Sequence, residues 1–176
     1  MSKNLTLSRA AVPLPLPVIE FCSRQMIDDE PAIAVELLTV GSNRWPLVAH
    51  LSTGEIYIDL NGALRIALWS GTRSNAALQA TRKASLIFVC DGSIYEVSCR
   101  CVAVQKLEGP TNLDAFLLTP VDVRDKSAPY AQVVSGVAYT YRHPLDAQAH
   151  WATLQSQLSL CFQASVVSSF DSSMNR

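Results

Sequence analysis

The feature that most restricts the fold of this chain is a series of short, apolar, β-branched segments separated by turn-forming residues. Such segments are typical of strands, and the short gaps between them favour antiparallel neighbours. Asn61-Gly62 is a strong hairpin signal because both residues tolerate a positive φ angle. The first half of the chain therefore predicts four strands, at residues 32–40, 45–51, 55–60 and 64–69.

The second half continues this pattern with a long hairpin. Residues 84–90 and 93–104 are predicted strands that are joined by a tight turn at Asp91-Gly92. In the later strand the residues alternate with period two, as in a half-buried strand. One face is expected to hold Tyr95, Val97, Cys99, Cys101 and Ala103, and the other Glu96, Ser98 and Arg100.

Three further segments follow the hairpin. Residues 113–118 are compatible with a helix or a strand, residues 122–129 are a charged loop, and residues 133–141 read as a last strand. Pro144 opens a C-terminal helix, at a position where its missing N–H is harmless. This helix carries an apolar face at helical spacing, made of Trp151, Leu154, Leu158 and Phe162.

Two other helices are predicted, at residues 19–27 and 76–82, and the prolines of residues 13–17 should exclude a helix there. Six or seven strands with short peripheral helices indicate a mostly β fold, an antiparallel barrel or a strongly curled sheet. The expected organisation is an N-terminal arm with a short helix (residues 1–30), one barrel domain (31–164) and a flexible tail (165–176).

Composition excludes several functional classes. Of the 176 residues, 49% are hydrophobic and 16% are charged, with a net charge of −1, which excludes a disordered chain and provides no overall attraction for nucleic acid. A membrane-spanning run and a signal-peptide core are both missing from the pattern, so a cytoplasmic location is expected. The five cysteines include no CxxC pair and are interpreted as buried thiols rather than a metal or redox site.

The segment most informative about chemistry is the strand, loop and helix of residues 64–78. Its loop holds the hydroxyls of Ser70, Thr72 and Ser74 together with Arg73, just ahead of a helix start. Helix N-termini attract phosphate, and an Arg can grip phosphate oxygens with two nitrogens. A simpler interpretation is equally open, in which Ser74 caps the helix and Arg73 is solvated.

This segment, followed by the hairpin of residues 84–104, resembles the FMN-binding split barrels, the pyridoxamine 5′-phosphate oxidase-like group. The resemblance covers residues 30–105, with residues 133–162 as the closing strand and terminal helix. It implies an antiparallel split β-barrel of six to seven strands with a C-terminal helix. It also implies a homodimer that holds FMN in clefts between its subunits.

The resemblance also implies which residues would contact the cofactor. The flavin phosphate would lie on Thr72, Arg73, Ser74 and Asn75. The isoalloxazine ring would be flanked by His50, Leu51, Ser52, Leu68, Trp69 and Ser70. Without the resemblance, His50 is interpreted as a hydrogen-bonded barrel histidine in preference to a catalytic base. Trp69 is equally compatible with lining a cofactor cleft and with packing inside the barrel.

One departure from the family pattern leaves the function open. The family often places a Lys early in the helix to bind the phosphate, whereas Ser74 or Asn75 stands there in this chain. The first hypothesis is an FMN-dependent oxidoreductase of unassigned substrate. The alternative is a non-catalytic binding or sensing module with a weakened or lost flavin site. A third is a structural barrel without a ligand, so the sequence does not decide whether the chain is an enzyme.

Overall fold

The computed structural model describes residues 11–24, 31–60 and 62–162. Its body is one antiparallel sheet with the strand order β3-β2-β6-β7-β8-β5-β4. These strands are β2 (Val35–Val40), β3 (Pro46–Leu51), β4 (Ile56–Ile58), β5 (Leu64–Trp69), β6 (Lys83–Cys90), β7 (Ser93–Lys106) and β8 (Leu113–Asp125). The other elements are α1 (Leu16–Ser23), α2 (Arg73–Thr81), α3 (Pro144–Leu160), the 3₁₀ turn η1 (Thr53–Glu55) and the paired short strands β1 (Ala32–Ile33) and β9 (Ala138–Tyr139).

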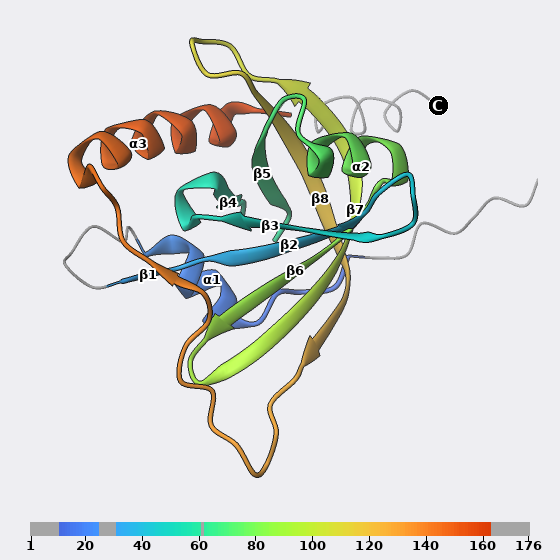
Figure 1. Cartoon of the computed structure of the whole chain (residues 1–176), viewed down its shortest axis with the longest axis vertical. Helices are drawn as coiled ribbons and strands as arrows, with labels where there is room; N and C mark the ends of the chain where they lie inside the picture. Colours follow the sequence, from blue (N-terminus) through green and yellow to red (C-terminus); the bar gives the residue numbers. More distant parts are fainter. Residues whose placement is uncertain (1–10, 25–30, 61, 163–176) are drawn as a thin grey trace, which may run out of the picture.

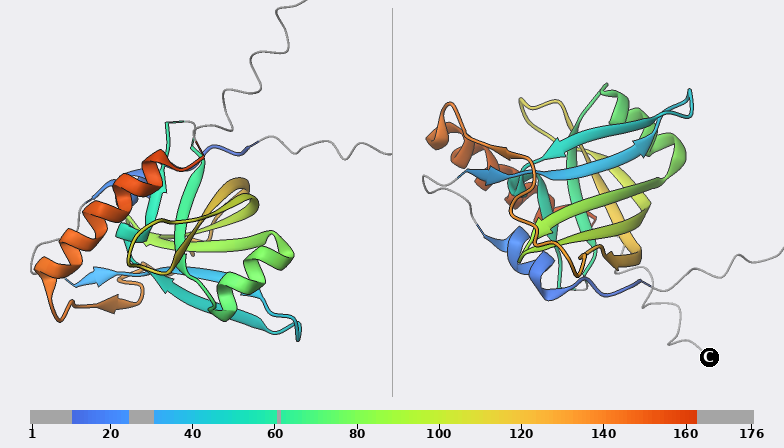
Figure 2. Two further views of the ribbon diagram at one scale, coloured as in Figure 1. Left: turned by 90° about the horizontal axis from the view of Figure 1, so that it is seen from above. Right: turned by 60° about the horizontal axis from the view of Figure 1, so that its bottom comes forward.

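The sheet curls strongly and encloses the main hydrophobic core on its inner face (Figures 1 and 2). Its strand order leaves β3 and β4 as the two edges, so the described residues form an open half-barrel. This confirms the predicted mostly β, antiparallel split-barrel class with a C-terminal helix. The expected closure of the sheet by hydrogen bonding does not occur between β3 and β4.

Strand β7 shows why the inward pattern could be read from the sequence. Val97, Cys99 and Cys101 alternate with outward residues and are all buried, as predicted. A register shift between Cys101 and Ala103 then interrupts the pairing with β8. Beyond it Ala103 is only half-buried and Val104 packs against the core, so the predicted face is wrong after the bulge.

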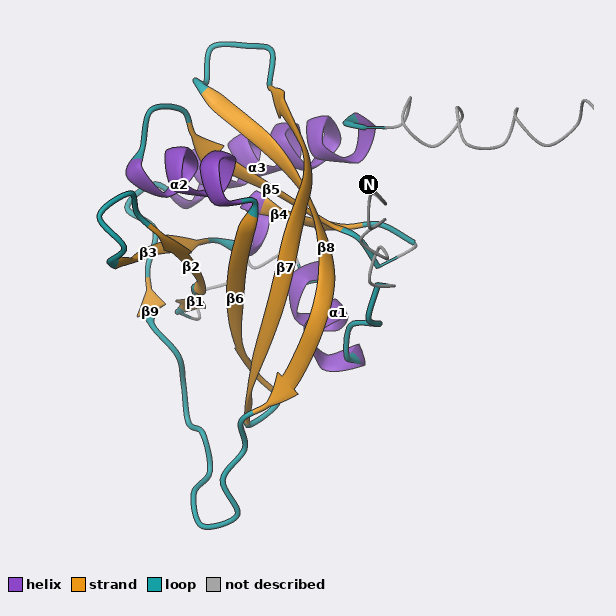
Figure 3. Cartoon of the chain, turned by 90° about the vertical axis from the view of Figure 1, so that its right-hand side faces the viewer, coloured by secondary structure: helices purple, strands orange, loops and turns teal. Residues whose placement is uncertain are grey.

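The structure decides the ambiguous segment after the hairpin. Residues 113–118 are extended, and β8 continues to Asp125 because it pairs with β7 along most of its length (Figure 3). The first part of the predicted charged loop is therefore strand. The predicted last strand at residues 133–141 is mostly wrong, because only β9 forms, and it pairs with β1 outside the main sheet.

The helix starts also differ from the predictions. Helix α1 begins at Leu16, inside the proline run, because Pro17 occupies the first turn, where a missing N–H costs nothing. The helix also ends at Ser23, with Arg24 as its C-cap, and so stops before the predicted end at residue 27. The predicted tail of residues 165–176 lies outside the described residues. Of the predicted arm, residues 11–24 are described.

Helix α3 covers the outside of β5 and β8 and confirms its predicted apolar face. Leu154 and Leu158 are buried against Ala67 and Ala115 of those two strands. The Gln155 amide Nε2 also donates to the backbone oxygens of Thr53, Gly54 and Ile56 at 3.3, 3.0 and 2.7 Å. The helix is thus fixed beside η1. None of the helices in the described part of the chain is long and apolar enough to span a membrane.

Candidate functional site

A cleft of about 340 Å³ opens where β3 ends, beside η1 and α3. Four of the residues predicted to flank a cofactor meet there, although β3 and β5 are far apart in the sheet order. These are His50, Leu51, Ser52 and Trp69. Its remaining lining residues are Ala34, Glu55, Tyr139, His150 and Trp151.

The other two predicted flanking residues do not line this cleft. Leu68 is buried on the inner face of β5 and belongs to the main core. The Ser70 backbone N–H donates to the carbonyl of Asn112 at 2.8 Å. The Ser70 hydroxyl is buried and has no hydrogen-bond partner among the described residues.

One wall of the cleft is aromatic. The Tyr139 and Tyr141 hydroxyls lie 2.8 Å apart, and the Tyr141 ring meets Trp151 edge-on with centroids 4.6 Å apart. Trp151 lies directly on the backbone of Gly54, where an added Cβ would be 2.1 Å from the indole. Glycine is therefore the residue that allows this approach. Trp151 was expected on the apolar face of the C-terminal helix, and no sequence pattern indicated Tyr139 as a site residue.

A half-buried carboxyl group, that of Glu55, lies in the same cleft. Glu55 Oε2 accepts a hydrogen bond from the Ser52 backbone N–H at 2.8 Å. Burial raises the pKa of Glu55 above its ordinary value, although the hydrogen bonds from Ser52 oppose that shift. Burial, and then the hydrogen bond to Tyr141, raise the pKa of Tyr139, so both groups keep their protons more readily. The spacing Ser52-x-x-Glu55 fits a capping box and could have indicated this residue.

The raised pKa of Glu55 predicts a pH dependence of stability. A carboxyl group whose pKa is higher in the folded state than in the unfolded state stabilises the fold fully below the unfolded value. This contribution is lost as the pH rises through the folded value. The variant Glu55→Gln stays neutral, so its free energy of unfolding should improve relative to the wild type between pH 4 and 8. Urea unfolding across that range checks this, with exposed Glu108→Gln as the control. Parallel profiles for wild type and Glu55→Gln would refute the assignment.

The loop before α2 has a different local structure from the one predicted. Thr72, not Ser74, is the N-cap of the helix, and its Oγ1 accepts from the Asn75 N–H at 3.4 Å. The same hydroxyl donates to the Trp69 carbonyl at 2.9 Å and so ties the loop to the cleft residue. Gly71 has a φ of +80°, and this turn lets the helix begin at Arg73, three residues earlier than predicted.

The four residues predicted to contact the flavin phosphate differ in their exposure. Thr72 and Arg73 are exposed, whereas Ser74 and Asn75 are buried. Asn75 Nδ2 donates to Asp114 at 2.8 Å, and its Oδ1 accepts from Gln79 at 2.7 Å. The Asn75 side chain is therefore engaged inside the protein.

Arg73 itself borders a second hollow, of about 430 Å³, between α2 and the turn from β2 to β3. That hollow shares no lining residue with the Trp69 cleft, so a single subunit does not bring Arg73 and Trp69 into one cavity. The exposed start of α2 nevertheless lies close to Trp69, because the Thr72 hydroxyl donates a hydrogen bond to the Trp69 carbonyl.

The histidines at the cleft also differ from expectation. His50 is exposed on the edge strand β3 and makes no side-chain hydrogen bond to the described residues, so the hydrogen-bonded barrel interpretation is wrong. His150, which no sequence pattern singled out, is half-buried in the same cleft. Within the described ranges, no cluster of three or more histidine, cysteine or acidic residues could hold a metal ion.

No protein-family model matches the chain. The Bacillus subtilis protein YclD, which is uncharacterized, is 29% identical over 135 residues, covering 76% of this chain and 88% of YclD.

Solved structures with a similar fold include an FMN-binding protein from Syntrophomonas wolfei. It is 17% identical, with a TM-score of 0.45, over 55% of this chain and 78% of that protein. A pyridoxamine 5′-phosphate oxidase-related, FMN-binding protein from Nostoc punctiforme is 12% identical, with a TM-score of 0.44, over 52% and 73% of the two chains.

Proposed function

We propose that this protein is an FMN-binding split-barrel flavoprotein of oxidoreductase type, with no substrate assigned. The observation that carries the proposal is the cleft that residues at the end of β3 share with Trp69. Trp69 is followed in the chain by the loop that leads into α2, whose start is suited to binding an anion. Residues that the family resemblance selected from two distant strands share this one cavity. The proposal extends to a cytoplasmic homodimer.

The residues present fit FMN in three respects. The cleft volume lies within the usual range of small-molecule sites, and Trp69, Tyr139 and Trp151 offer flat aromatic surface for a ring system. In the first turn of α2 the Asn75 N–H donates to Thr72 Oγ1, whereas the N–H groups of Arg73 and Ser74 have no acceptor within the helix and are available to a phosphate. The Ser70 hydroxyl follows Trp69 in the chain but lies outside the cleft lining; it is buried without a partner among the described residues and is a further donor for a ligand that reaches this loop.

When bound, FMN supplies the hydride or electron chemistry, and the protein supplies binding and orientation. Arg73 and the N–H groups of the first turn of α2 would hold the phosphate. Trp69 and His50 would border the ring, while α3 excludes water from one side through Trp151. Glu55 can hold a proton in the cleft because burial raises its pKa.

A homodimer would account for the separation of the two hollows. In one subunit Arg73 and Trp69 border different cavities, so a partner packed over the start of α2 could enclose both. Trp45 and Val48, at and near the β2–β3 turn beside Arg73, are 69% and 55% exposed and offer apolar surface for such a contact. Light scattering of the purified protein tests the dimer.

The variant Arg73→Ala should weaken FMN binding by roughly tenfold or more, because a charge-assisted grip on the phosphate is lost. Titrations followed by flavin fluorescence measure this, with riboflavin, which lacks the phosphate, as the matched ligand. Riboflavin affinity should stay unchanged in the variant. Arg124→Ala, which removes an exposed arginine paired with Asp122, is the control protein. Equal FMN affinities of wild type and Arg73→Ala would show that the phosphate assignment is wrong.

A second function, a binding or sensing module without turnover, is favoured by one observation. The start of α2 lacks a lysine, and the Asn75 side chain is already bonded to Asp114 and Gln79, so the phosphate would be held weakly. Colourless protein whose melting temperature rises with added FMN would support this module. Protein that purifies with flavin absorbance would support the first function, and protein with neither property would refute both.

A further inference from the structure

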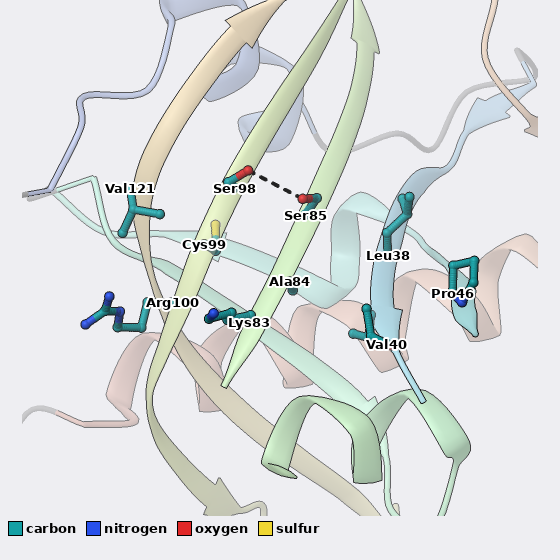
Figure 4. Close-up of a pocket in the computed structure, with 11 residues that line it drawn as sticks. Leu38, Val40, Pro46, Lys83, Ala84, Ser85, Ser98, Cys99, Arg100 and Val121 are labelled. Carbon is teal, nitrogen blue, oxygen red and sulfur yellow. Dashed lines mark hydrogen bonds between the residues drawn. The ribbon is translucent and has the colours of Figure 1, made fainter. Parts of the chain in front are cut away.

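A third hollow, of about 360 Å³, lies on the outer face of the sheet (Figure 4). Residues of β2, β3, β6, β7 and β8 line it, and none of them borders the Trp69 cleft. It is therefore separate from that cleft, although Val40 lines both this hollow and the one that Arg73 borders. An outer sheet face normally carries polar side chains toward water, so a hollow with apolar walls there calls for an explanation.

Two hydroxyls mark the middle of this hollow. Ser85 of β6 and Ser98 of β7 are register partners, and their side-chain oxygens are 3.5 Å apart (Figure 4). That distance is at the outer limit of a hydrogen bond, so the pair is only weakly satisfied. Each hydroxyl retains capacity to bind another polar group.

Two cations lie at one end of the hollow. Lys83 and Arg100 are direct cross-strand partners on β6 and β7, and both are exposed. Like charges placed opposite each other destabilise a sheet. Neither side chain forms an ion pair with a carboxylate in the described part of the chain. By contrast, Arg124 of β8 and Lys126, which follows β8 directly, each pair with a carboxylate at 2.8 Å.

The remaining walls are apolar. Leu38 and Val40 of β2 stand on one side of the serine pair with Pro46 of β3, and Val121 of β8 stands on the other (Figure 4). Val40 is 48% exposed, so apolar area remains open to water. The hollow thus combines an uncompensated positive end, two hydroxyls and apolar sides.

We propose that this hollow binds a small amphipathic organic anion, with its carboxylate on Lys83 and Arg100 and its apolar body along Leu38, Val40 and Val121. The anion would supply the negative charge that the cross-strand pair lacks, and its apolar part would cover exposed area. The volume falls within the range of small-molecule sites. A second protein chain would need a much larger flat contact, and the observations favour the small ligand.

The test uses octanoate as the probe and the full chain labelled with ¹⁵N. Amide shift changes on titration should centre on Leu38, Ser85, Ser98 and Val121. The double variant Lys83→Gln/Arg100→Gln should bind octanoate about tenfold more weakly, while octanol, which has no charge, should bind wild type and variant alike. The control Arg124→Gln/Lys126→Gln should bind octanoate as the wild type does. Failure of the double variant to weaken octanoate binding would overturn the proposal, as would shifts confined to the Trp69 cleft.

Two measurements keep this proposal distinct from the flavin proposal. The double variant should melt at the same temperature as the wild type or higher, because the like-charge pair is removed, so a loss of binding is not a loss of fold. FMN should leave the octanoate shifts in place, and Arg73→Ala should leave octanoate affinity unchanged. Displacement of octanoate by FMN, or a shift pattern that appears only as the chain associates with itself, would refute a separate small-anion site.

Discussion

Replacing Arg65 with methionine is expected to lower the free energy of unfolding by about 3–5 kcal/mol, because it removes one partner of a buried ion pair. Arg65 is 8% exposed, and its Nη2 lies 3.3 Å from Asp59. Its Nη1 donates to the carbonyls of Leu158 and Ser159 at 3.0 and 2.9 Å. One side chain of β5 therefore satisfies the last turn of α3, whose carbonyls have no partner within the helix.

The guanidinium geometry makes this position sensitive to lysine as well. Arg65→Lys keeps the charge but lacks the planar fork that reaches both α3 and Asp59, and so its loss of stability should be intermediate. Urea unfolding monitored by circular dichroism gives the values, and hydrogen exchange should show α3 opening first. The control Arg124→Met removes an exposed pair and should change stability by less than about 1 kcal/mol. If Arg65→Met lowered the free energy of unfolding no more than this control does, Arg65 would not have the stabilising role assigned to it.

The second large effect is expected at Gly54. The Trp151 indole packs directly against the Gly54 backbone, and an alanine Cβ would lie 2.1 Å from Trp151 Cγ. The variant Gly54→Ala should therefore lower the free energy of unfolding by about 2–3 kcal/mol through overpacking. The displaced indole also forms part of the cleft wall, so FMN affinity should fall in the same variant. Urea unfolding and flavin titration measure the two effects separately.

A double-mutant cycle identifies the cause of the Gly54 effect. In a Trp151→Ala background the clash is absent, and Gly54→Ala should then cost much less than in the wild type. Gly41→Ala is the control glycine, because its added Cβ would meet no atom closer than the Asn43 side-chain oxygen, at 3.0 Å. An equal cost of Gly54→Ala with and without Trp151 would show that the indole contact is not the cause.

Local patterns predicted the elements that depend on neighbouring residues. The hairpin of β6 and β7 forms around Asp91-Gly92, where both residues have positive φ angles, and its inward residues alternate as far as Cys101. The helix after the Ser70 loop and the apolar face of α3 were likewise predictable from spacing. The predicted start of α2 was three residues too late. Several residues of the loop could cap the helix, and Thr72 does so because its hydroxyl contacts Trp69 and Asn75.

The candidate site was only half predictable. The family resemblance selected His50 to Ser52 and Trp69, and these residues do share the cleft. Glu55 was not selected, although the local spacing Ser52-x-x-Glu55 fits a capping box. Tyr139 and Trp151 were not selected, because their importance comes from contacts between segments about 100 residues apart, such as Gln155 with η1. No local pattern records such a contact.

By itself, the sequence determined the strand-forming segments, their turns and the mostly β class, because these follow from side-chain alternation and backbone preferences over a few residues. Only the tertiary structure decided the strand order β3-β2-β6-β7-β8-β5-β4, and with it the three separate hollows. The order depends on which apolar faces can be buried together, and that is a property of the whole chain. For the same reason Lys83 and Arg100 became visible as an uncompensated pair only when β6 and β7 were aligned in register.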